Sequence, residues 1–313
     1  MVPTVKLCNG YDLPVLGLGT FNASLDKTER AVKDAIDIGY RHFDCAYRYG
    51  NEKEIGSGIR VKISEGVITR EDVFVTSKLW NTHHRPDLVV PACKTTLSDF
   101  GLDFLDLYLM HWPFAVKEGR ELKPRDATGR AIPSDVDYVD TWRAMEECVK
   151  LGLARSIGLS NFNSKQIQRI MDIATIKPAV HQIECHPYLT QEQLIAFSKV
   201  RGMAVTAHCP LGSPGSNAKP DTPPLLKDMR LQPLTAKYNK TAAQVVLRYL
   251  TQHGVIPIPK SENKQHLEEN YNIFDFELTE DEMHYISTFN RNIRICTFIE
   301  ARDHKDYPFH IEF

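Results

Sequence analysis

The feature that most constrains this chain is a regular alternation of short apolar segments with amphipathic ones. Apolar runs bounded by turn residues are typical of buried strands. Eight such strands are expected, at residues 13–19, 40–43, 73–77, 104–110, 155–159, 178–183, 203–207 and 255–258. The intervening segments repeat apolar residues with the helical period, as Ile167, Ile170 and Met171 do. Strands that alternate with helices predict βαβ units and a parallel sheet.

Eight such units in a chain of 313 residues suit a closed barrel better than an open sheet. We therefore predict the α/β class, with one (β/α)8 TIM barrel domain spanning residues 1–313. A β-hairpin with a two-residue turn at Asn9-Gly10 precedes the barrel. Helix starts are expected at a capping box of Asp26 and Glu29, at Ser164, and at a capping box of Thr241 and Gln244. Two long loops, at about 113–137 and 212–230, and a tail at 293–313 would cover the carboxyl-terminal face and gate access to substrate.

Composition excludes several classes of protein. Lys and Arg total 38 against 40 Asp and Glu, so the basic excess typical of a nucleic-acid binder is missing. No apolar stretch is long enough to suggest a membrane partner, and the first residues do not resemble a secretory signal. The seven cysteines are scattered and lack CxxC spacing, which indicates free thiols in the cytoplasm and no metal site.

Polar residues follow nearly every predicted strand. In a TIM barrel these positions meet on one face, where the active site is built. They are Asp44, Lys78, His111, Ser160, Asn161, Gln182, Glu184, His208 and Lys260. A single polar residue after a strand is usually the start of a solvated loop, but a set this complete favours a functional face.

Four residues of this face form a set suited to carbonyl reduction. A lysine stabilises a tyrosine phenolate, so Lys78 is expected to lower the pKa of Tyr49 and make it a general acid. Asp44 would keep Lys78 charged, because pairing offsets the cost of burial. A neutral His111 could orient the carbonyl oxygen by a hydrogen bond. Taken singly, these residues could equally be a buried ion pair, a surface tyrosine and a core histidine.

Several segments, in order along the chain, resemble the signatures of the aldo-keto reductase superfamily, and in particular its aldose reductase and aldehyde reductase group. They are GLGTF (17–21), GYRHFDCAYRYGNEKEIG (39–56), TSKLW (76–80), LYLMHWP (107–113), IGLSNF (157–162), IPIPKS (256–261) and DHKDYPFHIEF (303–313). The resemblance implies a barrel that binds NADPH without a Rossmann fold, and the chain indeed has no GxGxxG after a strand. It also implies a monomer.

The resemblance assigns roles to particular residues. It implies that Tyr49 donates the proton, that Lys78 and Asp44 tune it, and that His111 orients the carbonyl. The implied cofactor residues are Thr20, Asp44, Ser160, Asn161, Gln182, His208, Leu211, Ser213, Lys260, Ser261, Asn263, His266, Glu269 and Asn270. His208 stands where the family usually has a tyrosine under the nicotinamide. His266 replaces an arginine that binds the 2′-phosphate, so the preference for NADPH should be weaker and NADH is a second candidate.

The resemblance also implies a substrate site lined by aromatic residues around the catalytic set. The implied lining residues are Phe21, Tyr49, Trp80, His111, Trp112, Phe114 and Phe298. An aromatic lining with one polar anchor favours apolar aldehydes or steroid-like ketones, ecdysteroid ketones included, over sugars. An alternative remains open, since some relatives are non-enzymatic: a cofactor-binding sensor or a structural protein on the same scaffold.

Overall fold

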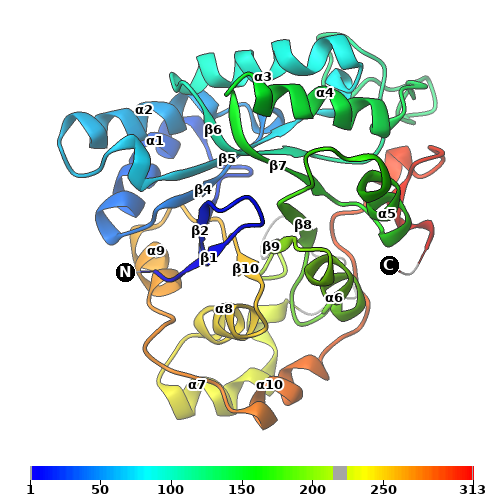
Figure 1. The fold of residues 1–313 in the computed structure, drawn as a ribbon. Coiled ribbons are helices and arrows are strands. Elements are labelled where there is room, and N and C mark those ends of the chain that lie inside the picture. The colour runs from blue at the N-terminus through cyan, green and yellow to red at the C-terminus, as the bar shows by residue number, and fades with distance from the viewer. Residues whose placement is uncertain (1, 214–223, 312) are drawn as a thin grey trace.

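The computed structural model describes residues 2–213, 224–311 and 313, and it confirms the predicted barrel. Eight parallel strands form its wall, in sequence order around the sheet. They are β3 (Leu18–Gly19), β4 (His42–Asp44), β5 (Phe74–Leu79), β6 (Leu105–Met110), β7 (Ala154–Ser160), β8 (Val180–Glu184), β9 (Ala204–His208) and β10 (Ile256–Pro257). Figure 1 shows these strands at the centre of the molecule with the helices arranged around them.

The sheet closes between its first and last strands. The Gly17 N–H donates to the Pro257 carbonyl at 3.1 Å, and the Gly19 N–H donates to the Pro259 carbonyl at 3.0 Å. Gly19 also forms a parallel bridge with Lys260. Closure leaves no free sheet edge, and it brings the residues that follow β3 and β10 side by side.

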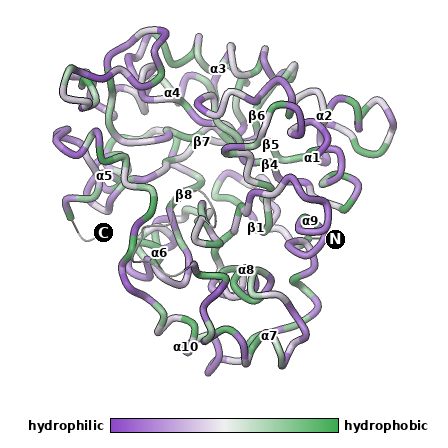
Figure 2. Tube along the Cα trace, turned by 180° about the vertical axis from the view of Figure 1, so that it is seen from behind, coloured by the Kyte–Doolittle hydropathy of each residue, from purple (hydrophilic) through white to green (hydrophobic). Residues whose placement is uncertain are grey.

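The helices form an outer ring and bury their apolar stripes against the barrel. They are α1 (Leu25–Ile38), α2 (Glu52–Ser64), α3 (Pro86–Phe100), α4 (Tyr138–Lys150), α5 (Ser164–Ile173), α6 (Glu192–Val200), α7 (Gln232–Tyr238), α8 (Ala242–Gln252), α9 (Lys264–Tyr271) and α10 (Glu280–Ser287). Figure 2 shows hydrophobic and hydrophilic residues alternating along this ring. None of the helices that the structure describes is both long and apolar enough to cross a membrane.

In the part of the chain that the structure describes, seven short 3-10 helices lie in the connections between these elements. They are η1 (Tyr47–Tyr49), η2 (Arg70–Asp72), η3 (Asn81–His83), η4 (Leu225–Lys227), η5 (Met229–Leu231), η6 (Ile299–Ala301) and η7 (Pro308–His310). Most of them follow barrel strands or belong to the tail, so they shape the loops of the carboxyl-terminal face. Of these, η1 carries Tyr49 directly after β4.

The predicted hairpin is present and closes the amino-terminal end of the barrel, where Figure 1 shows it in front of the strands. Its strands are β1 (Thr4–Lys6) and β2 (Asp12–Pro14), and its residues Leu7 and Leu13 pack with Phe74, at the start of β5. The prediction of one strand over 13–19 was wrong, because the first part of that run belongs to β2. The two-residue turn was also wrong. The Leu7 N–H donates to the Tyr11 carbonyl at 2.8 Å, and the Gly10 N–H donates to the Leu7 carbonyl at 2.9 Å. These bonds enclose a three-residue loop that ends at Gly10, whose φ is +91°.

Two of the three predicted helix starts need correction. α1 begins at Leu25 after Ser24, so Asp26 and Glu29 already lie inside the helix and the expected capping box does not exist. The Ser24 N–H donates to Glu262 at 2.5 Å. α5 is capped by Asn163 and Gln166 instead of Ser164. Local sequence offers several capping residues in a row, and the approach of another segment decides between them. The capping box of Thr241 and Gln244 on α8 is confirmed.

The first long loop and the tail are joined to each other over the carboxyl-terminal face. Arg130 pairs with Asp303 at 3.2 Å, and Arg125 pairs with Glu300. The Ala131 N–H donates to the Glu300 carbonyl at 3.0 Å. The two segments therefore form one layer. Of the second predicted loop, residues 214–223 lie outside the described residues.

Candidate active site

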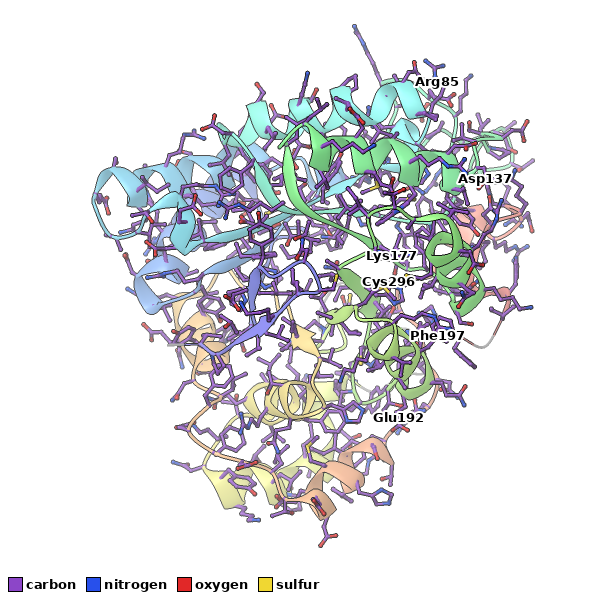
Figure 3. The ribbon with its side chains drawn as sticks, viewed as in Figure 1. Arg85, Asp137, Lys177, Glu192, Phe197 and Cys296 are labelled. Carbon is purple, nitrogen blue, oxygen red and sulfur yellow. The ribbon has the colours of Figure 1, made fainter. Side chains whose placement is uncertain are left out.

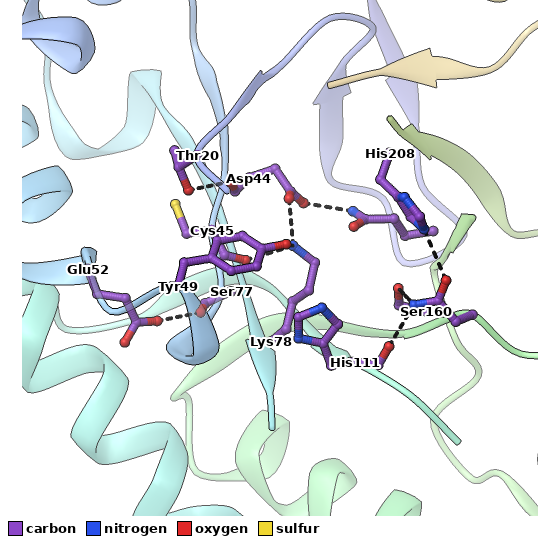
Figure 4. Close-up of polar contacts among 12 residues, drawn as sticks. Thr20, Asp44, Cys45, Tyr49, Glu52, Ser77, Lys78, His111, Ser160 and His208 are labelled. Carbon is purple, nitrogen blue, oxygen red and sulfur yellow. Dashed lines mark hydrogen bonds and ion pairs between the residues drawn. The ribbon is translucent and has the colours of Figure 1, made fainter. Parts of the chain in front are cut away.

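The polar residues at the strand ends converge on the carboxyl-terminal face, as a parallel barrel requires. Asp44 ends β4 and Ser160 ends β7, while Lys78 lies near the end of β5 and Gln182 near the end of β8. Figure 4 shows the side chains of Asp44, Lys78 and Ser160 gathered in one region, together with Tyr49, His111 and His208. All of the residues that the sequence placed after strands β4 to β9 are thus brought to one face.

Asp44 and Lys78 form a buried ion pair at the centre of this group. The Lys78 Nζ donates to Asp44 Oδ1 at 2.5 Å and to the Cys45 carbonyl at 2.8 Å. The second oxygen of Asp44, Oδ2, accepts a hydrogen bond from Gln182 Nε2 at 2.7 Å. The Lys78 side chain is fully buried. Because both charges are paired and further hydrogen-bonded, the ammonium group is held at a fixed position.

Tyr49 lies on η1, and its hydroxyl is 3.4 Å from the Lys78 Nζ. The ring keeps partial exposure to solvent, whereas the hydroxyl lies deep among protein atoms. Burial raises the pKa of Tyr49 well above its ordinary value, and the Asp44 carboxylate raises it further. The expected lowering of this pKa was therefore wrong, because desolvation outweighs the lysine when that lysine is already paired with an aspartate. The hydroxyl is held protonated, which is the form that a proton donor needs.

His111 lies directly after β6 and is buried beside Tyr49, with ring centroids 5.8 Å apart. Burial lowers the pKa of His111 well below its ordinary value, and the nearby Lys78 ammonium lowers it further. The ring is neutral at physiological pH, as the sequence predicted. Its Nδ1 is buried without a hydrogen-bond partner in the described part of the chain.

A second group of uncharged polar residues adjoins His111. The Asn161 Nδ2 donates to the His111 carbonyl at 3.0 Å and to the Ser160 hydroxyl at 3.1 Å. The Asn161 Oδ1 lies 3.0 Å from His208 Nε2. Asn161 has φ +61°, a left-handed conformation that asparagine adopts more readily than most residues. These contacts hold one amide and one hydroxyl at the centre of the face.

The remaining predicted cofactor residues lie in two parts of the molecule: the loops after β3 and β9, and the segment around the start of α9. Thr20 follows β3, and its hydroxyl donates to the Asp44 carbonyl at 2.9 Å. Leu211 and Ser213 lie in the loop after β9, and both are partly buried. Thr20 therefore adjoins the ion pair of Asp44 and Lys78.

The second place lies around the start of α9. Lys260 follows β10 and pairs with Glu262 at 3.3 Å. The Asn263 side chain caps α9 by accepting from the His266 N–H at 3.1 Å. The other members are Ser261 and Asn270, which are buried, and Glu269, which is partly buried, while the His266 side chain is exposed. The bridge between Gly19 and Lys260 links this place to Thr20 through the barrel seam.

Aromatic residues pack beside Tyr49 and His111. Trp80 lies against His111, with ring centroids 5.2 Å apart, and is stacked on Phe298 at 5.9 Å. Trp112 meets Phe298 edge-on at 5.4 Å. Phe21, which is half-exposed, meets the Tyr49 ring at 5.1 Å. Aromatic residues from the barrel loops and from the tail are thus brought together beside Tyr49.

Phe114 does not line this region as the sequence predicted. Its side chain is fully buried beneath Trp112 and Phe298, with ring centroids at 5.6 and 5.3 Å. Phe114 therefore supports the aromatic wall from behind. Sequence alone does not show whether a loop residue such as Phe114 lines the site or lies behind the aromatic wall, because neighbouring loop residues can face either side.

The sequence placed Glu184 on this face, but it did not predict that this buried glutamate anchors the tail. Both carboxylate oxygens of Glu184 accept hydrogen bonds at 2.7 Å, from the N–H groups of Ile295 and Cys296. Its Oε1 also lies 2.9 Å from His186 Nε2. Glu184 stands two residues after Gln182 on β8, so the strand alternation places both on the same face. That alternation was the available signal.

Comparisons with known proteins agree with this geometry. The model of the Aldo/keto reductase family matches residues 15–291. The chain is 48% identical to aldo-keto reductase family 1 member A1 of Gallus gallus, with 97% of each chain covered. It is 45% identical to family 1 member D1 of Mus musculus, covering 99% of this chain and 97% of the relative.

Solved structures give the same result. An aldose reductase from Schistosoma japonicum superposes with a TM-score of 0.94 at 43% identity, with 100% of each chain covered. A Bombyx mori aldo-keto reductase, solved in complex with NADP, superposes with a TM-score of 0.91 at 42% identity, covering 98% of this chain and 99% of the other. The chain therefore belongs to the aldo-keto reductase family, whose members are NAD(P)H-dependent oxidoreductases that reduce aldehydes and ketones.

Proposed function

We propose that this protein reduces apolar aldehydes and ketones to alcohols with NADPH, and that Tyr49 is the proton donor. One observation carries the proposal. The Tyr49 hydroxyl lies 3.4 Å from a buried lysine that is paired with Asp44, beside the neutral His111. This arrangement offers a proton and an orienting group to one oxygen atom, and it offers no nucleophile.

The chemistry of the donor groups fits NADPH at two places. The first holds the buried, uncharged polar groups of Ser160, Asn161 and Gln182, which suit a carboxamide, with Thr20 and His208 beside them. The second holds the Lys260 ammonium and the start of α9, where a cation and free backbone N–H groups suit a phosphate. When bound, NADPH supplies the hydride.

The route of the proton can be derived from the positions of the chain's own residues. The Tyr49 hydroxyl donates its proton to the carbonyl oxygen as negative charge develops there. The Lys78 ammonium then faces the phenolate, and Asp44 and Gln182 hold that ammonium in place. The neutral His111 ring donates a hydrogen bond to the same oxygen and so fixes the face that the carbonyl presents.

The aromatic residues support an apolar substrate. Trp80, Trp112 and Phe298 form a wall beside His111, and Phe21 stands on the other side of Tyr49. Such a wall favours apolar aldehydes or steroid-like ketones, ecdysteroid ketones included, because it offers hydroxyl-rich substrates few partners. We propose that the loop at 113–137 and the tail set this choice together, since they are joined through Arg130 and Asp303.

We propose that one copy of the chain, working in the cytoplasm, is sufficient for the reaction. Every residue invoked above lies on this one chain. The seven cysteines are all free, which fits a reducing compartment.

The first test measures oxidation of NADPH and of NADH with a panel of small aldehydes and one steroid ketone. The proposal expects turnover with NADPH and faster reduction of aromatic aldehydes than of a sugar aldehyde. Turnover of sugars alone would contradict the assignment of an apolar substrate. Cofactor binding without any turnover would overturn the proposed activity and favour the sensor or structural alternative.

Replacing Tyr49 by phenylalanine tests the proton donor. Tyr49→Phe should lower kcat at least about 100-fold, because general acid catalysis contributes that much or more. NADPH binding, followed by quenching of tryptophan fluorescence, should be unchanged. The control is Tyr47→Phe on the same turn, which retains the ring that packs against His83 at 5.3 Å. Normal turnover by Tyr49→Phe would exclude Tyr49 as the donor.

A further inference from the structure

Three side chains of the types that bind metal ions, from two distant parts of the chain, meet beside Asn161. His208 ends β9, Cys209 follows it, and Cys296 belongs to the tail (Figures 3 and 4 label Cys296 and His208). The Cys209 and Cys296 sulfurs are 3.4 Å apart, and one ligand atom from each of the three residues lies within 4.8 Å of the others. All three residues are partly buried, so an ion from solvent can reach them.

The hydrogen bonds around Asn161 decide which nitrogen of His208 is free. The Asn161 amide nitrogen donates to the His111 carbonyl, which can only accept, so the oxygen Oδ1 is the atom that faces His208. An amide oxygen also only accepts, so His208 Nε2 must carry the proton of that contact. In the neutral ring Nδ1 then has a free lone pair, which is what a metal ligand needs. A partner on the other nitrogen is also what orients histidine ligands in known metal sites.

The two cysteines are held in place by the surrounding backbone. Both the Cys296 N–H and the N–H of the residue before it donate to the buried Glu184 carboxylate. Cys209 has φ +49°, a conformation that is costly for a residue other than glycine and that tends to occur at functional sites. Its carbonyl accepts from the Gly212 N–H at 2.9 Å, which fixes the turn. The ligands are therefore arranged before any ion arrives.

We propose that His208, Cys209 and Cys296 form a binding site for a thiophilic divalent cation such as Zn²⁺. Thiolate and imidazole ligands suit this ion, and three of them leave a fourth tetrahedral position for water. With a Zn–S distance of about 2.3 Å, two sulfurs in a tetrahedral site lie about 3.8 Å apart. The observed 3.4 Å needs only a small adjustment. Two thiolates neutralise the ion, the Glu184 carboxylate adds negative charge behind them, and Arg294 opposes it.

Binding at this site has a consequence that rests on the proposed function. His208 would be shared between the metal and the cofactor, and the metal would tie the tail to the end of β9. Zn²⁺ and NADPH should therefore compete for the protein.

The test titrates the reduced, metal-free protein with Co²⁺, a spectroscopic substitute for Zn²⁺, and then displaces it with Zn²⁺. We expect one ion per chain and a thiolate-to-cobalt charge-transfer band. Cys209→Ser and Cys296→Ser should each weaken binding at least tenfold and diminish the band, whereas Cys8→Ser, which removes an exposed thiol elsewhere, should change neither. A band that survives both variants, the absence of any band, or oxidation of the two cysteines to a disulfide in place of binding would overturn the proposal.

A second arm separates this proposal from the proposed function. Saturating NADPH should lower the affinity for Zn²⁺, measured by displacement of Co²⁺. If the metal binds as described but NADPH has no effect, the metal site stands, and the placement of the cofactor beside His208 is wrong.

Discussion

At the scale of single residues, burial decides how each ionisable group of the barrel behaves. Desolvation favours the neutral forms of both Tyr49 and His111, because it raises the pKa of Tyr49 and lowers the pKa of His111. Asp44 and Lys78 stay together as a pair that is supported by further hydrogen bonds. The face thus combines neutral donors with one fixed ion pair, and that combination is what the proposed proton transfer needs.

Glu52, at the start of α2, should make stability depend on pH. It is buried, and it accepts hydrogen bonds from Ser77 at 2.6 Å and from Thr96 at 3.3 Å. Burial raises its pKa from 4.5 to about 7, so folding favours the protonated form. This contribution to stability is complete below pH 4.5 and is lost as the pH rises through 7, a change of about 3 kcal/mol in the free energy of unfolding.

Urea denaturation at several pH values measures this effect. Glu52→Gln cannot ionise, so its stability relative to the parent protein should increase by about 3 kcal/mol between pH 4.5 and pH 8. Glu54→Gln, at a partly exposed position of the same helix, is the control and should follow the parent. A difference between Glu52→Gln and the parent that does not vary with pH would contradict the prediction.

His266 should limit the preference for NADPH. Its exposed side chain stands at the start of α9, in the segment that follows Lys260, and the Lys260 ammonium is itself paired with Glu262. Arginine is always charged and binds phosphate with two hydrogen bonds, each worth about 1.5–3 kcal/mol. His266→Arg should therefore raise the ratio of kcat/KM for NADPH over NADH by about tenfold. His284→Arg, the same change at an exposed position of α10, is the control, and equal ratios in the two variants would reject this role.

At the scale of elements, each helix start depends on which hydrogen-bonding groups reach it. α8 keeps the capping box that its sequence predicts, with the Gln244 N–H donating to the Thr241 hydroxyl at 3.2 Å. α1 has no such cap, and the N–H of its N-cap residue Ser24 instead donates to Glu262 from the segment after β10. Capping is local where a helix start faces solvent, and it is decided by neighbours where another segment approaches.

The cap of α8 gives a prediction of known size. Thr241→Ala removes the hydroxyl that satisfies the Gln244 N–H and should lower the free energy of unfolding by about 1 kcal/mol. Thr251→Ala, near the end of the same helix, removes a hydroxyl that only donates to the Arg248 carbonyl. That control should stay within about 0.5 kcal/mol of the parent. Equal losses in the two variants, measured by thermal or urea unfolding, would argue against the capping role.

At the scale of the whole molecule, barrel closure links Thr20 and Asp44 to the residues around α9. β3 and β10 meet at a seam where Gly19 bridges Lys260. A Cβ on Gly19 would lie 2.5 Å from the Ile258 carbonyl oxygen. The seam therefore requires glycine because the two backbones approach too closely for any side chain.

Gly19→Ala should open this seam. The obstructing atom belongs to the backbone and cannot rotate away, so the loss in free energy of unfolding should reach about 3 kcal/mol. Gly66→Ala is the control: a Cβ there meets open space, and the cost of its left-handed backbone is about 1 kcal/mol. NADPH affinity should fall only in Gly19→Ala. Equal destabilisation, with unchanged affinity in both variants, would show that the seam tolerates a side chain.

The sequence by itself determined the barrel, the gathering of the polar residues from the strand ends on one face, and the cap of α8. These features follow from spacing along the chain, because strand alternation and helical period are local properties. Only the tertiary structure decided the raised pKa of Tyr49, the burial of Phe114, the uncapped start of α1 and the meeting of Cys209 with Cys296. Each of these depends on atoms from distant segments: desolvation is set by everything packed around a group, and the two cysteines are 87 residues apart in sequence.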